Sequence, residues 1–314
     1  PIPKELVQSI YDNWYRFFMS EQKQDFLFNR ETQDGYFPPS VSEVAKGHSQ
    51  KDIKEYFHIY PWGQMPAELK EQAMEYYRLA NDLAAELLGW VEQHTPGDIA
   101  AHYSCPLSSM IEESHKTLLR VLHYPPFDGT EEPGAIRAAA HEDINLLTIL
   151  PASNEPGLQV KGSDGEWMDV PCDFGTLIIN IGDMLQEASR GYYPSTTHRV
   201  INPTGGSAAK SRISLPLFLH PRPDVVLSER HTAHSYLMER LRELGVRAVG
   251  ENRDQEAGPK AAEVTAVLAE REHVAALARA VHLPSFGRGP SPTLEKRAKE
   301  RLVMRGLRPD EAWW

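Results

Sequence analysis

The amino-acid sequence predicts a mainly β protein, an antiparallel sandwich or jelly roll with helical segments on either side of it. Between residues 117 and 228, short β-type runs alternate with turn signals at near-regular spacing, as in antiparallel all-β folds. Before and after this region, apolar residues recur at helical spacing instead. With 314 residues the chain can bury a sizeable core, and β folds of this size are common as one unit.

Residues 1–116 are expected to form a helical and lid region. Apolar residues recur at helix spacing over residues 6–17, just after Pro3, a residue favoured at helix starts. Residues 31–64 are rich in aromatic residues, proline and glycine, and are expected to be loop-like. A long amphipathic helix is predicted over residues 66–91. Its apolar stripe consists of Leu69, Ala73, Tyr76, Ala80, Leu83, Leu87 and Val91.

Residues 117–228 are expected to form the β core. The predicted strands are residues 118–124, 146–150, 158–161, 167–170, 176–181, 197–202 and 212–220. Turn signals rich in Gly, Pro, Asn and Asp lie between several of them, at residues 154–157, 163–165 and 203–206. This spacing indicates two packed antiparallel sheets.

Residues 229–314 are expected to be a helical C-terminal extension. Helices are predicted over residues 236–244 and 260–283, and a last one begins at Ser291-Pro292. This last stretch is rich in Lys and Arg and ends in Trp313-Trp314, which would suit a peripheral contact with an anionic membrane surface. A packing helix or a contact in a homo-oligomer is the alternative, because residues 260–283 carry an apolar stripe.

The composition of the chain argues against several classes of protein. The chain has 33 Lys and Arg against 44 Asp and Glu, a formal net charge of −11, which does not suit general nucleic-acid binding. Cys105 and Cys172 are far apart, which argues against a disulfide framework and for a reducing compartment. We see neither a signal peptide nor an apolar run of about 18 residues that could span a membrane. We therefore expect a cytoplasmic protein, with the inner face of the membrane as the alternative.

Two histidines and a carboxylate stand out as metal-ligand candidates. His141 and Asp143 are two residues apart, so on a strand their side chains would point to the same side, and His198 would complete the set from a later strand. Two imidazoles and one carboxylate without thiolate are typical of non-haem Fe(II) oxygenases, in which coordination positions stay open. Structural zinc usually takes four protein ligands, whereas catalytic zinc with three ligands remains a chemical alternative.

Arg212 and Ser214 form a second candidate group. Their spacing also places both side chains on one face of a strand. A guanidinium suits a carboxylate because it can donate two parallel hydrogen bonds. The pair therefore predicts a carboxylate-binding position near the metal. No Gly-x-Ser-x-Gly elbow is present, so Ser214 is not interpreted as a nucleophile, and we predict no catalytic residue beyond the metal site.

These motifs resemble the ferrous 2-oxoglutarate-dependent dioxygenase superfamily, in its isopenicillin N synthase-like branch. The resemblance covers roughly residues 1–245 and is strongest over residues 118–220. It rests on residues 141–150 (HEDINLLTIL), 158–160 (LQV), 180–185 (NIGDML), 197–200 (THRV) and 212–216 (RISLP).

The resemblance implies a double-stranded β-helix, which is a distorted jelly roll, and an Fe(II) centre that uses O₂ with 2-oxoglutarate as co-substrate. It implies that Arg212 and Ser214 bind the far carboxylate of 2-oxoglutarate and that Tyr124 assists. The family's Asn-x-Tyr motif is Leu122-His123-Tyr124 in this chain, so leucine replaces the asparagine.

Substrate contacts are expected from Arg137, which lies just before the strand that carries His141, and from Tyr36 and His58 in the expected lid. A solvated arginine is the alternative for Arg137, and ordinary packing is the alternative for the two aromatic residues.

The resemblance implies a hydroxylase that acts on an unactivated C–H bond of a small or sugar-like acidic substrate and releases succinate and CO₂. The most specific expectation is 3-hydroxylation of the Kdo sugar of lipopolysaccharide, with a small molecule or a glycolipid as substrate. One alternative is an oxidative cyclase like isopenicillin N synthase, which uses no 2-oxoglutarate. Another is a non-catalytic protein that keeps the fold.

Overall fold

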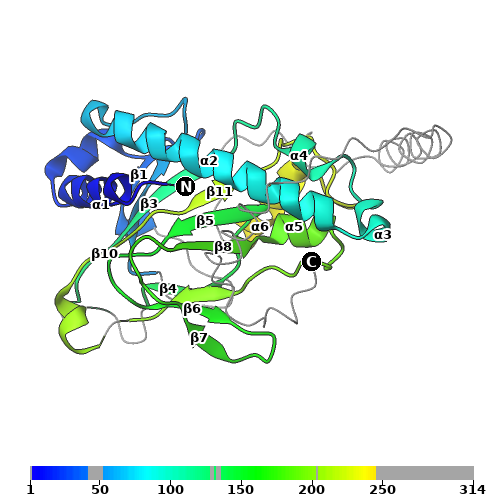
Figure 1. Ribbon diagram of the computed structural model, residues 1–314. Coiled ribbons are helices and arrows are strands. Elements are labelled where there is room, and N and C mark those ends of the chain that lie inside the picture. Colours follow the sequence, from blue (N-terminus) through cyan, green and yellow to red (C-terminus); the bar gives the residue numbers. More distant parts are fainter. Residues whose placement is uncertain (1, 42–51, 128–130, 132–135, 203, 245–314) are drawn as a thin grey trace.

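The computed structural model describes residues 2–41, 52–127, 131, 136–202 and 204–244. In this part of the chain two antiparallel sheets form two layers, and two helices lie across the outer face of the larger sheet (Figure 1). The predicted mainly β architecture with flanking helices is confirmed.

The helices and strands alternate unevenly along the chain. The α-helices are α1 (Lys4–Phe18), α2 (Ala67–His94), α3 (Gly97–Ala100), α4 (Leu107–Met110), α5 (Asp183–Ala188) and α6 (Ala233–Glu243). The strands are β1 (Gly35–Phe37), β2 (Glu55–Ile59), β3 (Leu118–Tyr124), β4 (Ala138–His141), β5 (Leu147–Pro151), β6 (Leu158–Lys161), β7 (Trp167–Asp169), β8 (Leu177–Ile181), β9 (His198–Val200), β10 (Arg212–Ser214) and β11 (Leu217–Leu219). Three short 3₁₀ helices span Glu21–Phe26, Pro39–Val41 and Gly205–Ala209.

The larger sheet has the strand order β1-β2-β3-β11-β5-β8, and β10 also pairs with β3. The smaller sheet has the order β4-β9-β6-β7. Every described strand pair is antiparallel. From β3 to β6 the chain alternates between the two sheets, because β3 and β5 belong to the larger sheet and β4 and β6 to the smaller one. Such crossing between two antiparallel sheets is expected for a jelly roll.

Helices α1 and α2 were predicted from their periodicity, and both are confirmed. Each buries one apolar face, and the two helices pack on each other and on the larger sheet. In α2 the buried positions include Ala73, Ala80 and Ala84, whose small side chains let the helix lie close to the strands. In α1 the Trp14 ring lies 5.0 Å from the ring of Phe57 in β2. These contacts form the main core of the protein.

A second, smaller apolar cluster lies between the two sheets. It combines side chains of β1, β2 and β3 with side chains of the smaller sheet. Its buried members are Phe37, Tyr56, Leu122, Tyr124, Ala138, Leu158 and Val200. This cluster occupies the inner face of the larger sheet, whereas α1 and α2 cover the outer face.

The prediction that residues 31–64 form loops is wrong at two places, because β1 and β2 add two strands to the larger sheet. All residues of both strands are buried, so their sequence lacks the alternation of apolar and polar residues that marks a half-exposed strand. The expected N-terminal lid region thus contributes directly to the sheet.

The predicted strand over residues 212–220 is divided into β10 and β11, with Leu215 and Pro216 between them. Pro216 has no N–H to donate to a ladder, although its carbonyl oxygen accepts a bond from the Arg120 N–H at 3.0 Å. Strand β3 therefore pairs with β10 at one end and with β11 at the other.

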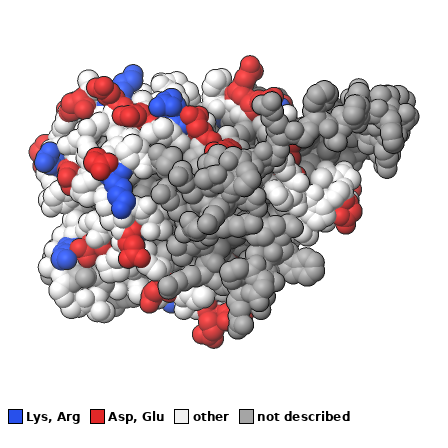
Figure 2. Space-filling model, viewed as in Figure 1, with Lys and Arg blue, Asp and Glu red and all other residues white. Residues whose placement is uncertain are grey.

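The helix predicted over residues 236–244 is confirmed as α6, which begins with a capping box formed by Thr232 and Ser235. The helices predicted over residues 260–283 and from Ser291, together with the basic tail, lie outside the described residues. No described helix combines the length and the apolar character needed to cross a bilayer. Over the described part of the face in Figure 2, acidic side chains are interspersed with basic ones.

Candidate metal centre and adjoining pocket

His141, Asp143 and His198 come together at the end of β4 and the start of β9. One ligand atom from each side chain lies within 4.8 Å of the others. Asp143 Oδ1 is 3.6 Å from His198 Nε2 and 3.9 Å from His141 Nε2. The two histidines are register partners across β4 and β9, which places their rings side by side with centres 4.3 Å apart. The structure thus assembles the three predicted ligands around one point.

Both imidazole rings are oriented by a backbone carbonyl. His141 Nδ1 lies 2.7 Å from the carbonyl oxygen of Ala139, and His198 Nδ1 lies 2.9 Å from that of Thr196. A carbonyl oxygen only accepts, so each Nδ1 carries the proton and donates it. Each Nε2 then presents a lone pair toward Asp143, as a metal-ligating histidine requires.

The carboxylate is oriented by two neutral donors. Asp143 Oδ2 accepts bonds from Thr148 Oγ1 at 2.6 Å and from Asn180 Nδ2 at 2.9 Å. Asn145 Nδ2 donates to the same Thr148 hydroxyl at 2.8 Å, which leaves the hydroxyl proton for Asp143. Oδ1 is therefore the oxygen that faces the two imidazoles.

These two supporting residues were not predicted from the sequence. Thr148 and Asn180 are polar positions inside the otherwise apolar strands β5 and β8, and that pattern could have identified them. The expectation that His141 and Asp143 share one strand is also wrong. Strand β4 ends at His141, and the Asp143 carbonyl oxygen accepts a bond from the Asp183 N–H at 2.9 Å. Asp143 is thus held by the segment that begins α5.

The electrostatics of the cluster fit a bound cation. Burial, together with the neighbouring His198, lowers the pKa of His141 to about 4, so the ring is neutral and can donate its lone pair. Burial alone would raise the pKa of Asp143, but the two imidazoles and the bonds from Thr148 and Asn180 outweigh it and hold the pKa low. A carboxylate and two neutral imidazoles are the donor set that suits Fe(II).

A second histidine, the half-buried His220, shares this titration behaviour. Burial lowers the pKa of His220 to about 4. Unfolded histidine has a pKa of about 6.5, so between pH 6.5 and 4 the unfolded chain binds protons that folded His141 and His220 do not. The free energy of unfolding of the metal-free protein should therefore fall as the pH falls through this window, by about 2 kcal/mol at pH 5 for His220 and by less for His141, whose side chain is 35% exposed and therefore screened by solvent.

Urea unfolding of the metal-free protein at pH 7 and pH 5 measures this difference. The variant His220→Gln should show a smaller difference than the wild type, because one of the two groups is gone. Equal free energies of unfolding at both pH values would contradict the prediction.

Arg212 and Ser214 lie on β10 beside Tyr124 and Leu122 of β3, their respective register partners. Arg212 is only 2% exposed, its Cζ lies 5.3 Å from the centre of the Tyr124 ring, and its Nε donates to the Glu155 carbonyl oxygen at 3.2 Å. Arg212 Nη1 is buried and has no hydrogen-bond partner in the described structure. A buried guanidinium nitrogen without a partner is costly, and a carboxylate would satisfy it.

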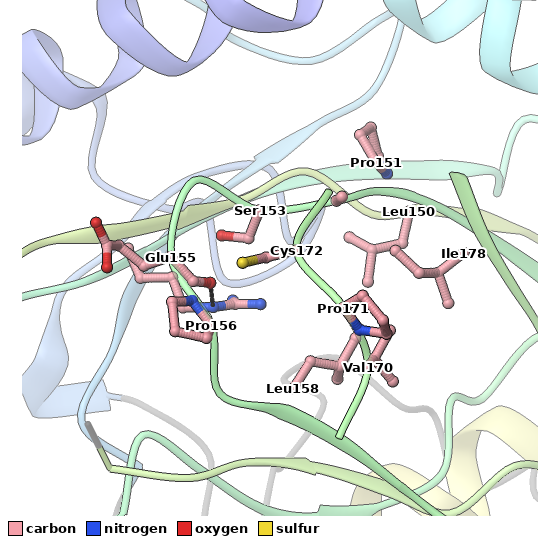
Figure 3. Close-up of a pocket in the computed structure, with 12 residues that line it drawn as sticks. Leu150, Pro151, Ser153, Glu155, Pro156, Leu158, Val170, Pro171, Cys172 and Ile178 are labelled. Carbon is pink, nitrogen blue, oxygen red and sulfur yellow. Dashed lines mark hydrogen bonds between the residues drawn. The ribbon is translucent and has the colours of Figure 1, made fainter. Parts of the chain in front are cut away.

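A pocket adjoins Arg212 at the end of the sheets away from the three ligands. It is lined by Leu150, Pro151, Ala152, Ser153, Glu155, Pro156, Leu158, Val170, Pro171, Cys172, Ile178 and Arg212. Leu158, Val170 and Ile178 provide apolar side chains on one side of the pocket, whereas the Ser153 hydroxyl and the Cys172 thiol point toward Glu155 and Pro156 on the other (Figure 3). The buried Arg212 at the edge of these apolar side chains suits a carboxylate.

Alternate residues of β3 point to opposite sides of the sheet, and this separates Tyr124 from His123. His123 faces α1, where its ring stacks on Phe18 and its Nδ1 lies 2.7 Å from Glu55 Oε1. Leu122 and Tyr124 belong to the inner cluster. His123 therefore does not replace the asparagine that is missing at position 122.

The two aromatic candidates of the expected lid lie on different sides of the sheet. Tyr36 is 1% exposed, packs in the main core, and its hydroxyl donates to the Glu55 carboxylate on the helix-covered face. The expectation that Tyr36 contacts substrate is wrong, because β1 directs it away from the metal side. His58 lies on the inner side of β2, where its ring is 4.5 Å from that of Phe37, a member of the inner cluster.

Arg137 is placed beside Arg212. Its side chain is 0% exposed, and its Nη2 donates to the Lys210 carbonyl oxygen at 2.9 Å, two residues before Arg212. The alternative of a solvated arginine is therefore wrong, since the whole side chain is buried.

The chain is similar to known oxygenases. Residues 116–221 match the model of the 2OG-Fe(II) oxygenase superfamily. A crystal structure of a putative oxygenase from Shewanella oneidensis shares 66% sequence identity and superposes with a TM-score of 0.70, over 79% of this chain and 88% of that one. A 2-oxoglutarate-Fe(II) type oxidoreductase, hxnY, from Emericella nidulans is 28% identical over 72% of this chain and 69% of its own length.

A second fungal relative, a 2-oxoglutarate-Fe(II) type oxidoreductase from Aspergillus fumigatus, is 30% identical over 69% of this chain. The match covers 62% of that protein, so this chain spans somewhat less than two thirds of its length.

Proposed function

This chain belongs to the 2OG-Fe(II) oxygenase superfamily, and on that premise we propose that it hydroxylates a C–H bond of a small acidic substrate whose acid group is bound by Arg120. The enzyme is a dioxygenase that uses Fe(II), O₂ and 2-oxoglutarate. His141, Asp143 and His198 would hold the metal, and Arg212 would hold the far carboxylate of 2-oxoglutarate, near Tyr124 and Ser214. When bound, the metal and co-substrate supply the oxidising power, and 2-oxoglutarate leaves as succinate and CO₂.

The position of Arg120 carries the proposal. Arg120, Leu122 and Tyr124 alternate along β3, so Arg120 projects from the same face as the co-substrate residue Tyr124. Strand β11 lies between β3 and β5, and its Phe218 is the register partner of Thr148, the donor to Asp143. Phe218 is also the register partner of Leu118, so two strand spacings and two residues of β3 separate Arg120 from Thr148, which is about 12 Å between backbones. A substrate that extends from the metal toward β3 would therefore come within reach of the long Arg120 side chain.

The surroundings of Arg120 fix its guanidinium group. Its Nε donates to His58 Nε2 at 2.8 Å, and His58 Nδ1 in turn lies 2.9 Å from the carbonyl oxygen of Gln33. The guanidinium carbon is 4.6 Å from the ring centre of Tyr56 and 5.4 Å from that of Phe218. A cation that is oriented between aromatic rings in a half-buried position binds an anion more strongly than a solvated arginine does. His58 thus supports substrate binding through Arg120.

A sugar acid is the most specific substrate class that we propose, and the Kdo sugar of lipopolysaccharide, hydroxylated at carbon 3, is its first candidate. The acid group would bind Arg120, and a glycolipid as well as a small molecule would satisfy this chemistry. Succinate release with Fe(II), 2-oxoglutarate and each candidate tests the proposal, and no release above the uncoupled background with any sugar acid would contradict it.

The relatives' use of 2-oxoglutarate favours a hydroxylase over the cyclase that needs no 2-oxoglutarate. Anaerobic addition of 2-oxoglutarate to the Fe(II) protein should therefore produce a weak visible charge-transfer band, and its absence would favour the cyclase.

The variant Arg120→Met tests the substrate anchor. We expect the KM for the acidic substrate to rise at least about tenfold, because a charged hydrogen bond to the acid group is lost. Uncoupled turnover of 2-oxoglutarate should stay within about twofold, since Arg120 lies away from Arg212. Arg120→Lys, which keeps the positive charge, should raise the KM less than Arg120→Met does.

Arg78→Met is the matched control, because Arg78 is an exposed arginine of α2 that pairs with Asp82. An unchanged KM in Arg120→Met would overturn the role of Arg120 and leave the family assignment intact.

A further inference from the structure

We infer that Arg137 is a second binding residue for the far carboxylate of 2-oxoglutarate, which it would hold together with Arg212. The inference rests on the proposed function in one respect, the binding of 2-oxoglutarate next to Arg212. Arg137 would be a positioning and affinity residue for the co-substrate.

Arg137 and Arg212 approach the same end of β3 from different sheets. Arg137 Nη2 lies 2.9 Å from the carbonyl oxygen of Lys210 and 3.4 Å from that of Pro125. Lys210 precedes Arg212 by two residues, and Pro125 directly follows Tyr124, the register partner of Arg212. The two guanidinium groups therefore lie at one end of the space between the sheets.

Both arginines are buried and incompletely bonded. Arg137 is 0% exposed and Arg212 is 2% exposed. Arg137 Nε and Nη1, together with Arg212 Nη1, are buried atoms without a hydrogen-bond partner in the described part of the chain. Most buried polar atoms in proteins have a partner, so three unpartnered donors at one place indicate a missing acceptor.

The like charges of Arg137 and Arg212 also indicate a bound anion. Burial, and then the nearby Arg212, lower the pKa of Arg137 to about 10. Two like charges in a buried place repel each other, and an anion between them would remove that penalty. Glu155 is an acidic neighbour, but its carboxylate pairs with Lys210 Nζ at 3.0 Å. A ligand carboxylate would therefore complete this arrangement.

The distance from the metal identifies the ligand group. Arg137 directly precedes β4, and His141 is the last residue of that strand. Four residues of strand span about 13 Å, so the backbone of Arg137 is far from the metal ligands. The reacting carbon of a substrate must lie next to the metal, whereas the far carboxylate of 2-oxoglutarate lies at the end of the co-substrate away from the metal. Arg137 thus suits the co-substrate better than the substrate.

Binding of two 2-oxo acids to the anaerobic Fe(II) protein tests the inference. 2-Oxoglutarate has the far carboxylate, and 2-oxovalerate has the same carbon chain without it. Calorimetry gives both dissociation constants without any turnover. For Arg137→Met we expect the Kd of 2-oxoglutarate to rise about tenfold to hundredfold, as for the loss of a hydrogen bond to a charged group, and the Kd of 2-oxovalerate to change less than about twofold.

Arg137→Lys keeps the charge and should recover part of the affinity for 2-oxoglutarate. Arg199→Met is the matched control and should change neither constant, because Arg199 is an arginine of the smaller sheet that stacks on Trp167 and bonds to Gln159. Thermal unfolding without ligand establishes that each variant is folded.

Two results would overturn the inference. One is a folded Arg137→Met or Arg137→Lys protein that binds 2-oxoglutarate as tightly as the wild type. The other is an equal loss of affinity for both 2-oxo acids, which would indicate a purely structural role. A wild-type protein that does not distinguish the two acids, and in which Arg212→Met has no effect either, would instead contradict the co-substrate assignment itself.

Discussion

Replacing Asp143 by asparagine is expected to remove Fe(II) from the protein and to lower turnover at least about 1,000-fold while the fold persists. The reason lies in the two donors behind the carboxylate. Thr148 and Asn180 both donate to Oδ2, and Asn145 fixes the direction of the Thr148 hydroxyl. An asparagine must direct its carbonyl oxygen toward these donors, which turns its NH₂ group toward the histidines. An amide NH₂ cannot ligate a metal, so one of three ligands is lost.

Metal analysis after anaerobic reconstitution, combined with succinate release, measures this effect. Glu142→Gln is the matched control, because Glu142 lies between two of the ligands in sequence while its carboxylate accepts a bond from Thr197 Oγ1 at 2.9 Å. That variant should retain iron. An Asp143→Asn protein with a full complement of tightly bound iron would show that the metal binds elsewhere.

Replacing Arg212 by methionine is expected to raise the KM for 2-oxoglutarate by about 100-fold to 1,000-fold. Methionine preserves the volume of the buried side chain but removes the charge and the unpaired Nη1. The loss should appear mainly in binding, since the reacting end of the co-substrate lies at the metal. Arg212→Lys should be intermediate, because a lysine supplies the charge without the two parallel bonds.

Steady-state kinetics at varied 2-oxoglutarate, with calorimetric binding under argon, separate the effect on KM from that on kcat. Lys161→Met is the control, because Lys161 is an exposed, charged residue at the end of β6. A KM unchanged within about threefold in Arg212→Met would show that the carboxylate of the co-substrate binds elsewhere.

Elements with a strong periodic pattern could be predicted from the sequence. Helices α1 and α2 follow from their apolar stripes, and β3 was predicted with the bounds that it has in the structure. Strands β1 and β2 were missed because both of their faces are covered, so that charged and aromatic residues such as Glu55 and Tyr36 are buried with the apolar ones. A pattern based on solvent exposure cannot detect such strands.

The three residues of the candidate metal site could also be predicted, but the geometry around them could not. His141, Asp143 and His198 were recognisable from their spacing. The roles of Thr148 and Asn180 depend on pairing between β5 and β8, where the two residues are register partners. The burial of Arg137 beside Arg212 depends on how the two sheets face each other. Such contacts between segments distant in sequence are not encoded in local patterns.

The pairing of β3 with β2 and β10 limits how this enzyme can tolerate insertions. Adding one residue within β3 would exchange its two faces, so that His123 would enter the space between the two sheets and Tyr124 would turn toward α1. The turn at residues 163–165 between β6 and β7 is exposed and lies outside the strands that carry the candidate metal ligands and Arg212. An engineer who wants to graft a peptide tag or a second domain should therefore choose that turn, and natural length variation should concentrate there rather than in β3.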